Sequence, residues 1–122
     1  MFDKLCEKYT GPHLVPRSGG WDSRLILSAL RKRLSPSEIA TVSYGCPGQL
    51  DYEIGAKVAK KAGVKHEKIN LEKVTLNWET LLESVNKSPW TCVPNGYFDS
   101  FAQSRAGEMY SVKCVWIGFM GD

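Results

Sequence analysis

The sequence of 122 residues lacks the patterns of several common classes of protein. No apolar stretch approaches the roughly 20 residues that cross a membrane, and charges are spread from Met1 to Thr10, unlike a signal peptide. No basic run is longer than Arg31-Lys32-Arg33 and the net charge is only +3, so nucleic-acid binding is not indicated. Internal repeats and low-complexity segments are also missing. We therefore expect a cytoplasmic chain without membrane or nucleic-acid partners.

The cysteines and glycines also lack several familiar spacings. The four cysteines form neither a CxxC nor a Cys/His pattern, so they predict buried, reduced thiols rather than a zinc or dithiol site. They are Cys6, Cys46, Cys92 and Cys114. Neither GxxxxGK[ST] nor GxGxxG occurs, which excludes the ordinary NTPase loop and the dinucleotide fingerprint.

Strand-like and helix-like segments alternate along the chain. Its length and its 43% apolar content suffice for one domain with a core. We expect strands at about 13–17, 39–44, 65–71 and 112–117, and helices at about 3–9, 24–34, 52–62, 77–86 and 98–107, the third capped by Asp51 and stopped by Gly63. The alternation predicts an α/β fold, a three-layer sandwich with a parallel sheet of about four strands and helices on both faces. The lysines of 65–71 indicate an edge strand, and the apolar run 112–117 indicates a buried one.

The segment Ser18-Gly19-Gly20-Trp21-Asp22-Ser23 follows the first expected strand and precedes a helix. Adjacent glycines let the backbone approach an anion, and the helix adds free N–H groups and the positive end of its dipole. The two serine hydroxyls can donate to phosphate oxygens. Asp22 fits beside an anion only if a cation, with Mg²⁺ the natural candidate, lies between them. The segment predicts a phosphate-binding loop; a plain Gly/Ser turn is the alternative.

Three loops are expected at the carboxyl edge of the sheet, where ligands of parallel α/β sheets bind. They are residues 18–23, 44–48 and 118–122. Because the strands that they follow are parallel, Asp22 and Asp122 would lie close to one another. The topology therefore predicts a possible two-carboxylate clamp for a metal ion.

Three stretches in this order resemble the synthetase domain of the asparagine synthetase family, whose phosphate loop is the PP-loop of the ATP pyrophosphatases. They are Val15 to Arg24; Gly45-Cys46-Pro47-Gly48 with Asp51 and His66; and Gly118-Phe119-Met120-Gly121-Asp122. The resemblance spans nearly the whole chain but only about the first half of that domain. It implies a single, truncated domain over residues 1–122 of the HUP or adenine nucleotide alpha hydrolase-like type, without the family's glutaminase domain.

The resemblance implies an ATP-dependent ligase that forms an amide bond. A carboxylic acid attacks the α-phosphate of ATP to give an acyl-adenylate and pyrophosphate, and an amine or ammonia then displaces AMP. Asp22 and Ser23 would be catalytic, and Asp22 and Asp122 would hold Mg²⁺. The residues implied for ATP and pyrophosphate are Ser18, Gly19, Gly20, Asp22, Ser23, Val42, Tyr44, Gly45 and Gly118.

The last of these stretches departs from the asparagine-forming members. Ile117 and Phe119 replace a serine and a glutamate, so the resemblance does not imply aspartate as the acid. An ATP-binding module or fragment without catalysis is the alternative, and a partner chain or self-association would supply the missing half. A sulfur-transfer enzyme acting on tRNA would need paired cysteines and a nucleic-acid surface, which the sequence does not show. His66 is a candidate general base or, as favoured on an edge strand, a structural or surface histidine.

Overall fold

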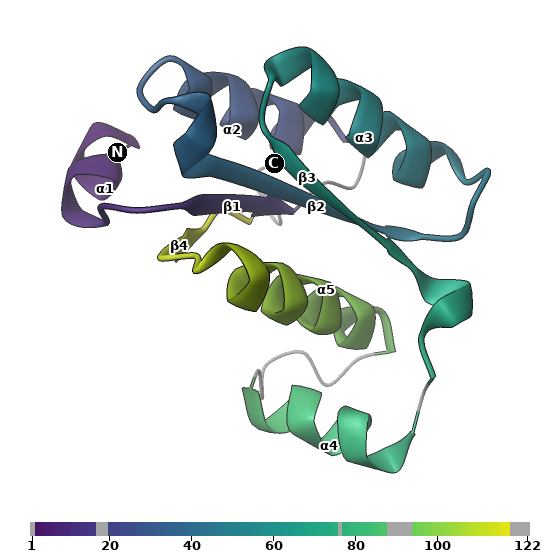
Figure 1. Cartoon of the computed structure of the whole chain (residues 1–122). Helices are drawn as coiled ribbons and strands as arrows, with labels where there is room; N and C mark the ends of the chain where they lie inside the picture. The colour runs from purple at the N-terminus through teal and green to yellow at the C-terminus, as the bar shows by residue number, and fades with distance from the viewer. Residues whose placement is uncertain (1, 17–19, 76, 88–93, 118–122) are drawn as a thin grey trace.

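The structure is a computed structural model that describes residues 2–16, 20–75, 77–87 and 94–117. Helices and strands alternate along most of the chain (Figure 1). The α-helices are α1 (Phe2–Lys8), α2 (Trp21–Arg31), α3 (Leu50–Ala62), α4 (Trp78–Lys87) and α5 (Pro94–Tyr110), with short 3-10 turns at Pro36–Glu38 and Leu71–Lys73. The strands are β1 (His13–Pro16), β2 (Ile39–Gly45), β3 (Lys65–Asn70) and β4 (Cys114–Val115).

The four strands form one parallel sheet in the order β3-β2-β1-β4. The chain moves outward from β1 to β2 and β3, then crosses back to place β4 on the other side of β1. This reversal puts the topological switch point between β1 and β4, where open α/β sheets bind their ligands. As the lysines of 65–71 predicted, β3 lies at an end of the order.

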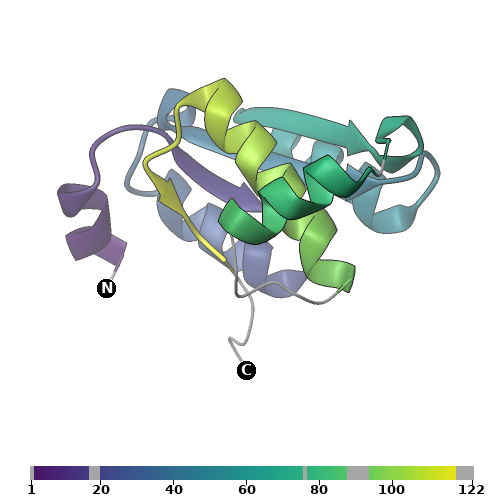
Figure 2. The same cartoon turned by 90° about the horizontal axis from the view of Figure 1, so that it is seen from below.

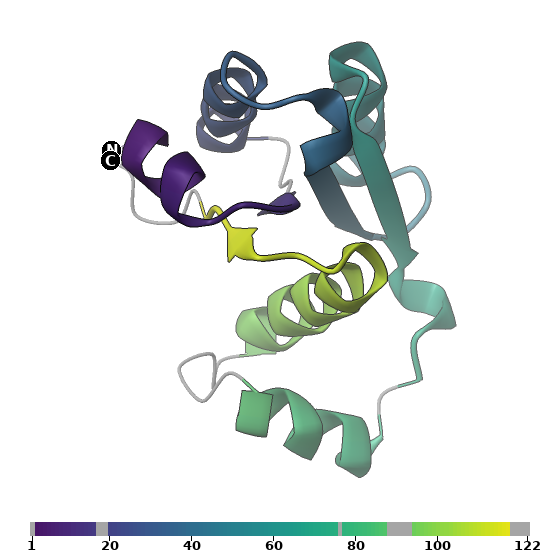
Figure 3. The ribbon, with the colours of Figure 1, turned by 60° about the vertical axis from the view of Figure 1, so that its left-hand side comes forward.

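Helices cover both faces of the sheet. Helices α2 and α3 lie side by side on one face, and α5 covers the other face with α4 packed outside it (Figure 2). Figure 3 shows the same layers from another side. The expected three-layer α/β sandwich is therefore confirmed. Among the described helices, none combines the length and hydropathy that crossing a bilayer requires.

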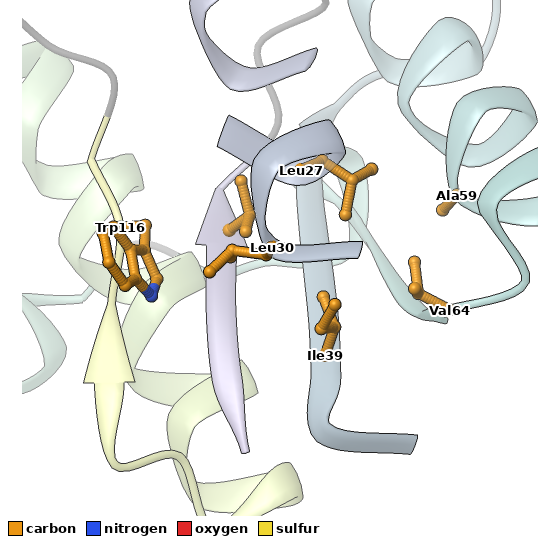
Figure 4. Packing of buried hydrophobic residues seen from close by; sticks show 7 residues of the cluster. Leu27, Leu30, Ile39, Ala59, Val64 and Trp116 are labelled. Carbon is orange, nitrogen blue, oxygen red and sulfur yellow. The ribbon is translucent and has the colours of Figure 1, made fainter. Parts of the chain in front are cut away.

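Successive residues of β1 and β2 point into opposite halves of the core, as the alternation of a strand requires. Val15 and Ile39 face α2 and α3, whereas Leu14 and Val42 face α5. The first half contains Val15, Leu27, Leu30, Ile39, Ala59, Val64 and Trp116 (Figure 4). The second contains Leu14, Ala40, Val42, Ile69, Ala102 and Ala106. Both faces of β1 are thus buried, which is typical of a central parallel strand.

Three helix boundaries differ from those expected. Helix α2 already begins at Trp21 and ends at Arg31, and α3 is capped by Gln49 instead of Asp51, which lies in its first turn. Helix α5 begins at Pro94, four residues earlier than predicted. Proline is well suited to a first helical position because its missing N–H would have no helical partner there. The sequence predicts a loop at Pro94, because the prolines near it suggest an irregular segment.

The last strand was predicted as a buried parallel run over 112–117; a parallel strand lies within this range, but the predicted length and burial are wrong. Strand β4 contains only Cys114 and Val115 and pairs only with β1, at one end of the sheet order. Val115 is 39% exposed and Ile117 is 61% exposed. An apolar run can mark a central strand, which has a neighbouring strand on each side. Among the described residues, β4 has a neighbouring strand on one side only, so part of it stays exposed.

A buried pair of rings joins β1 to the end of β4. His13 is fully buried, and its Nε2 lies 2.9 Å from the carbonyl oxygen of Tyr9. The indole N–H of Trp116 donates to Nδ1 of His13 over 2.9 Å. Since an indole nitrogen can only donate, Nδ1 must accept and Nε2–H donates to Tyr9. Both nitrogens of this buried histidine are therefore satisfied.

Replacing Trp116 by phenylalanine should destabilise the fold by about 1–3 kcal/mol, because Nδ1 of buried His13 loses its donor. The measurement is urea unfolding of Trp116→Phe beside wild type. Trp78→Phe is the matched control, since Trp78 is 70% exposed and its loss should change the unfolding free energy by less than about 0.5 kcal/mol. Equal effects of the two substitutions would contradict the role assigned to the indole N–H.

Gly63 and Gly107 offer a second matched pair. An added Cβ would meet nothing within 4 Å at either position, but Gly63 ends α3 with φ at +69° whereas Gly107 lies inside α5. Gly63→Ala should cost about 1 kcal/mol, since a left-handed backbone suits glycine. Gly107→Ala should gain roughly 0.5–1 kcal/mol from helix propensity. Thermal melts of both variants check the opposite signs, and a neutral Gly63→Ala would refute the expectation.

Candidate functional site

The carboxyl edge of the sheet carries two of the three loops expected to meet there. Pro16, the last residue of β1, is in register with Val42, so β2 extends three residues further to Gly45. The chain after β1 enters α2 at Gly20, and the chain after β2 enters α3 at Gln49. Both helices therefore begin beside this edge, on the same face of the sheet (Figure 1). Residues 118–122, the third loop, lie outside the described part of the chain.

The backbone N–H groups in the first turn of α2 donate no hydrogen bond to a capping side chain. The cap residue of α2 is Gly20, which has no side chain to accept from these groups. The Ser23 side chain is 5% exposed, and its hydroxyl donates to the Gly20 carbonyl oxygen over 3.1 Å. Ser23 thus fixes the turn, while Asp22 is exposed in the same helical turn. Ser18 and Gly19, predicted for the same loop, fall outside the described residues.

Arg24 is a feature of this turn to which the sequence assigned no role. Its guanidinium carbon lies 5.2 Å from the centre of the Trp21 ring, and Trp21 is 82% exposed. The Nε atom of Arg24 is buried and has no hydrogen-bond partner among the described residues. A cation in the first turn of a helix opposes the helix dipole unless an anion lies nearby. Asp22 in the same turn is one such anion, and a phosphate ligand would be another.

The turn between β2 and α3 is fixed by the side chain of Gln49. The side-chain Oε1 of Gln49 accepts a hydrogen bond from the backbone N–H of Cys46 over 2.8 Å, and the backbone N–H of Gln49 donates to the Cys46 carbonyl oxygen over 3.1 Å. Gly45 has φ at +153°, and an added Cβ there would lie 2.7 Å from Oε1 of Gln49. The glycine therefore allows both the backbone conformation and the approach of Gln49.

Three residues implied for the nucleotide lie in the last part of β2. Val42 is 1% exposed: its side chain packs in the core under α5, and its backbone lies between β1 and β3. Tyr44 is half-buried and packs against the same half of the core. Gly45 is the last residue of β2, just before the turn that leads into α3. Gly118 is outside the described residues.

The predicted metal clamp is only partly visible. The Asp22 side chain is exposed beside the start of α2, whereas Asp122 lies in the segment that the structure does not describe. Within the described ranges, no group of three His, Cys, Asp or Glu side chains could hold a metal ion. Mg²⁺ usually takes its ligands from one or two carboxylates together with substrate phosphates and water.

His66 lies apart from the start of α2, on β3. Its Nδ1 is 2.7 Å from the Thr41 hydroxyl, and its Nε2 is 3.0 Å from the Ser43 hydroxyl. Both hydroxyl groups are buried and also lie within reach of backbone carbonyl oxygens, those of Lys65 and Tyr52. These contacts favour the structural interpretation of His66 over that of a general base.

Comparison of the chain with protein-family models found no match, and comparison with curated proteins found none. The function is therefore inferred from the residues and the geometry of the chain.

Gly45→Ala should destabilise the protein by about 1–3 kcal/mol, because the new Cβ displaces Gln49 from the Cys46 N–H. Gly48→Ala is the control: Gly48 also has a positive φ, +88°, but an added Cβ there would meet nothing within 4 Å. Urea unfolding measures both losses, and amide exchange at Cys46 reports the local bond. If exchange at Cys46 accelerates equally in the two variants, Gln49 does not fix the turn.

Proposed function

We propose that the chain binds Mg²⁺–ATP at the carboxyl edge of its sheet and belongs to an ATP-dependent ligase of the asparagine synthetase type. The observation that carries the proposal is the start of α2, a helix N-terminus capped by Gly20, with Asp22 exposed beside it. It follows β1 directly, next to the switch point of the sheet. This is the position at which open α/β sheets hold nucleotide phosphates.

The charges of this turn support a phosphate ligand with a cation. The free N–H groups and the dipole of α2 favour an anion, and the guanidinium of Arg24 adds a positive charge to the same turn. Asp22 would repel the same anion unless a divalent cation lay between them. Mg²⁺ would be held by Asp22 and phosphate oxygens, with Asp122 as a second carboxylate ligand. In this setting it would neutralise charge that develops on the departing pyrophosphate.

The proposed reaction has two steps. A carboxylate oxygen attacks the α-phosphorus of ATP, the bond to the bridging oxygen breaks, and pyrophosphate leaves. An amine or ammonia then attacks the acyl carbon and displaces AMP. In this proposal Ser18, Gly19 and Gly20 hold the pyrophosphate, and Asp22 and Ser23 position it, Ser23 by fixing the turn. Catalysis then rests on positioning and electrostatic stabilisation.

An ATP-binding module without catalysis is the second candidate. Ile117 and Phe119 stand where the asparagine-forming members have a serine and a glutamate, and Ile117 is 61% exposed. An apolar side chain at either position supplies no group for acid–base chemistry. This candidate shares the ATP site with the first and differs only in the release of pyrophosphate.

The proposal also concerns partners and location. ATP and a carboxylic acid are the proposed ligands, and the proposed use of cellular ATP implies a cytoplasmic chain. Self-association, or contact with a partner chain, is part of the proposal. Exposed apolar side chains at Trp21 and Leu25 on α2, and at Leu50 on α3, are available for such contacts.

Asp22→Ala should weaken Mg²⁺-dependent ATP binding at least about tenfold, since the variant loses the carboxylate ligand of the cation. The measurement is titration calorimetry with ATP, with and without Mg²⁺. Asp51→Ala is the matched control, because Asp51 is an exposed acid in the first turn of α3 beside the same edge. Its affinity should stay within about twofold of wild type.

The proposal would be overturned if the wild-type chain is folded, as judged by circular dichroism, but the same sample shows no ATP binding by calorimetry. Equal losses in the two variants would show that the carboxylate of Asp22 has no special role. Pyrophosphate release that requires a carboxylic acid would support the ligase, whereas ATP binding without release would favour the module. The variants are compared in one buffer because exposed charges are screened by salt.

A further inference from the structure

Helix α1 packs beside β4, the strand at one end of the sheet. The Phe2 ring stacks on Trp116 with 4.9 Å between ring centres and 9° between ring planes. Arg33 forms an ion pair with Asp3, and its guanidinium lies 5.6 Å from the Phe2 ring. These contacts fix the first turn of α1 beside Trp116. Figure 2 shows α1 on the side of the sheet where β4 lies.

The other end of α1 lies at the start of β4. The Tyr9 carbonyl, just after the helix, accepts a hydrogen bond from His13, and His13 is in register with Cys114. The backbone N–H of Lys113 donates to the Pro12 carbonyl over 2.9 Å. Helix α1 therefore runs from the level of Trp116 toward the level of Cys114, antiparallel to β4.

The rise per turn of a helix and the two-residue repeat of a strand indicate that Cys6 of α1 and Cys114 of β4 lie near each other. Cys6 lies one helical turn after Phe2, a rise of about 6 Å along the axis. Cys114 lies two residues before Trp116, on the same side of the strand, about 6.6 Å away. Because Phe2 is stacked on Trp116, Cys6 comes opposite Cys114. Both side chains pack against the half of the core that contains Trp116.

We propose that Cys6 and Cys114 are a redox pair, whose reversible disulfide fastens α1 to β4. Both are free thiols in this structure. Cys114 is paired with the first residue of β1, so the pair lies toward the amino ends of the strands and away from the start of α2. The inference is thus independent of the proposed function.

Electrostatics agree with this placement. Burial raises the pKa of the Cys114 thiol, and repulsion from Cys6 raises it further. Burial also raises the pKa of Cys6, partly opposed by the positive charge of Arg33. Since the thiolate is the nucleophile in disulfide exchange, a raised pKa slows oxidation at neutral pH. The rate should increase as the pH rises toward the pKa of the attacking thiol.

The chemistry needs an oxidant, and a small disulfide such as oxidised glutathione suffices. One protein thiolate attacks a sulfur of the oxidant, forming a mixed disulfide and releasing one glutathione thiolate. The second protein thiolate attacks the mixed disulfide at the protein sulfur and releases the second glutathione. Two protein thiols are thereby oxidised to one disulfide, and one molecule of oxidised glutathione is reduced to two thiols.

The test is incubation of the whole folded chain with oxidised glutathione from about pH 7 to about pH 9, followed by tryptic mapping without reductant. We expect a peptide in which 5–8 is joined to 114–122, with the summed mass of the two reduced peptides less two hydrogen atoms. It should form faster at the higher pH and disappear on reduction. Cys46→Ser, the control, should leave this peptide unchanged, and Cys114→Ser should abolish it.

The oxidised chain should also melt roughly 10 °C above the reduced one, because the bond closes most of the chain into a loop. Cys114→Ser should show no such shift. Glutathione adducts at Cys6 or Cys114 without the joined peptide would overturn the proposal. So would a joined peptide that contains Cys46 or Cys92 instead, or no reaction of either thiol at the higher pH.

Discussion

The structure depends on the parallel pairing of β1 between β2 and β4. Strand β1 has only four residues, yet Leu14 and Val15 are fully buried against opposite helical layers. The same strand places His13 under Trp116 at its start and leads into the Gly20 cap after its end. Because both neighbours pair with β1, a shift of its register would move each side chain to the other face and separate both halves of the core.

The position of the proposed nucleotide site follows from this strand. Two crossovers carry α2 and α3 over one face, and the return through α4 and α5 covers the other. The reversal puts the switch point of the sheet between β1 and β4. The turn of Gly20, Asp22 and Arg24 follows β1 and brings N–H groups, a carboxylate and a guanidinium together there. The fold supplies the place, and these side chains supply the chemistry.

Polar groups inside the fold are held in specific local arrangements. His13 is fixed by an indole donor and a carbonyl acceptor, and His66 by two hydroxyl groups beneath α3. Each arrangement joins segments that are distant in the sequence. Leaving one such buried group unpaired costs more than a typical hydrogen bond contributes, so these contacts favour one packing of the strands and of α1 over others.

Local patterns in the sequence determined the alternation of elements, the parallel sheet, the edge position of β3 and the stop of α3 at Gly63. These depend on short-range periodicity and on backbone freedom, which neighbouring residues decide. Tertiary structure alone decided that the run at 112–117 yields a two-residue edge strand, that His13 is bound by Trp116, and that Cys6 and Cys114 pack against the same half of the core. Each outcome depends on which segments become neighbours in space, because burial and partnership are properties of the packed chain.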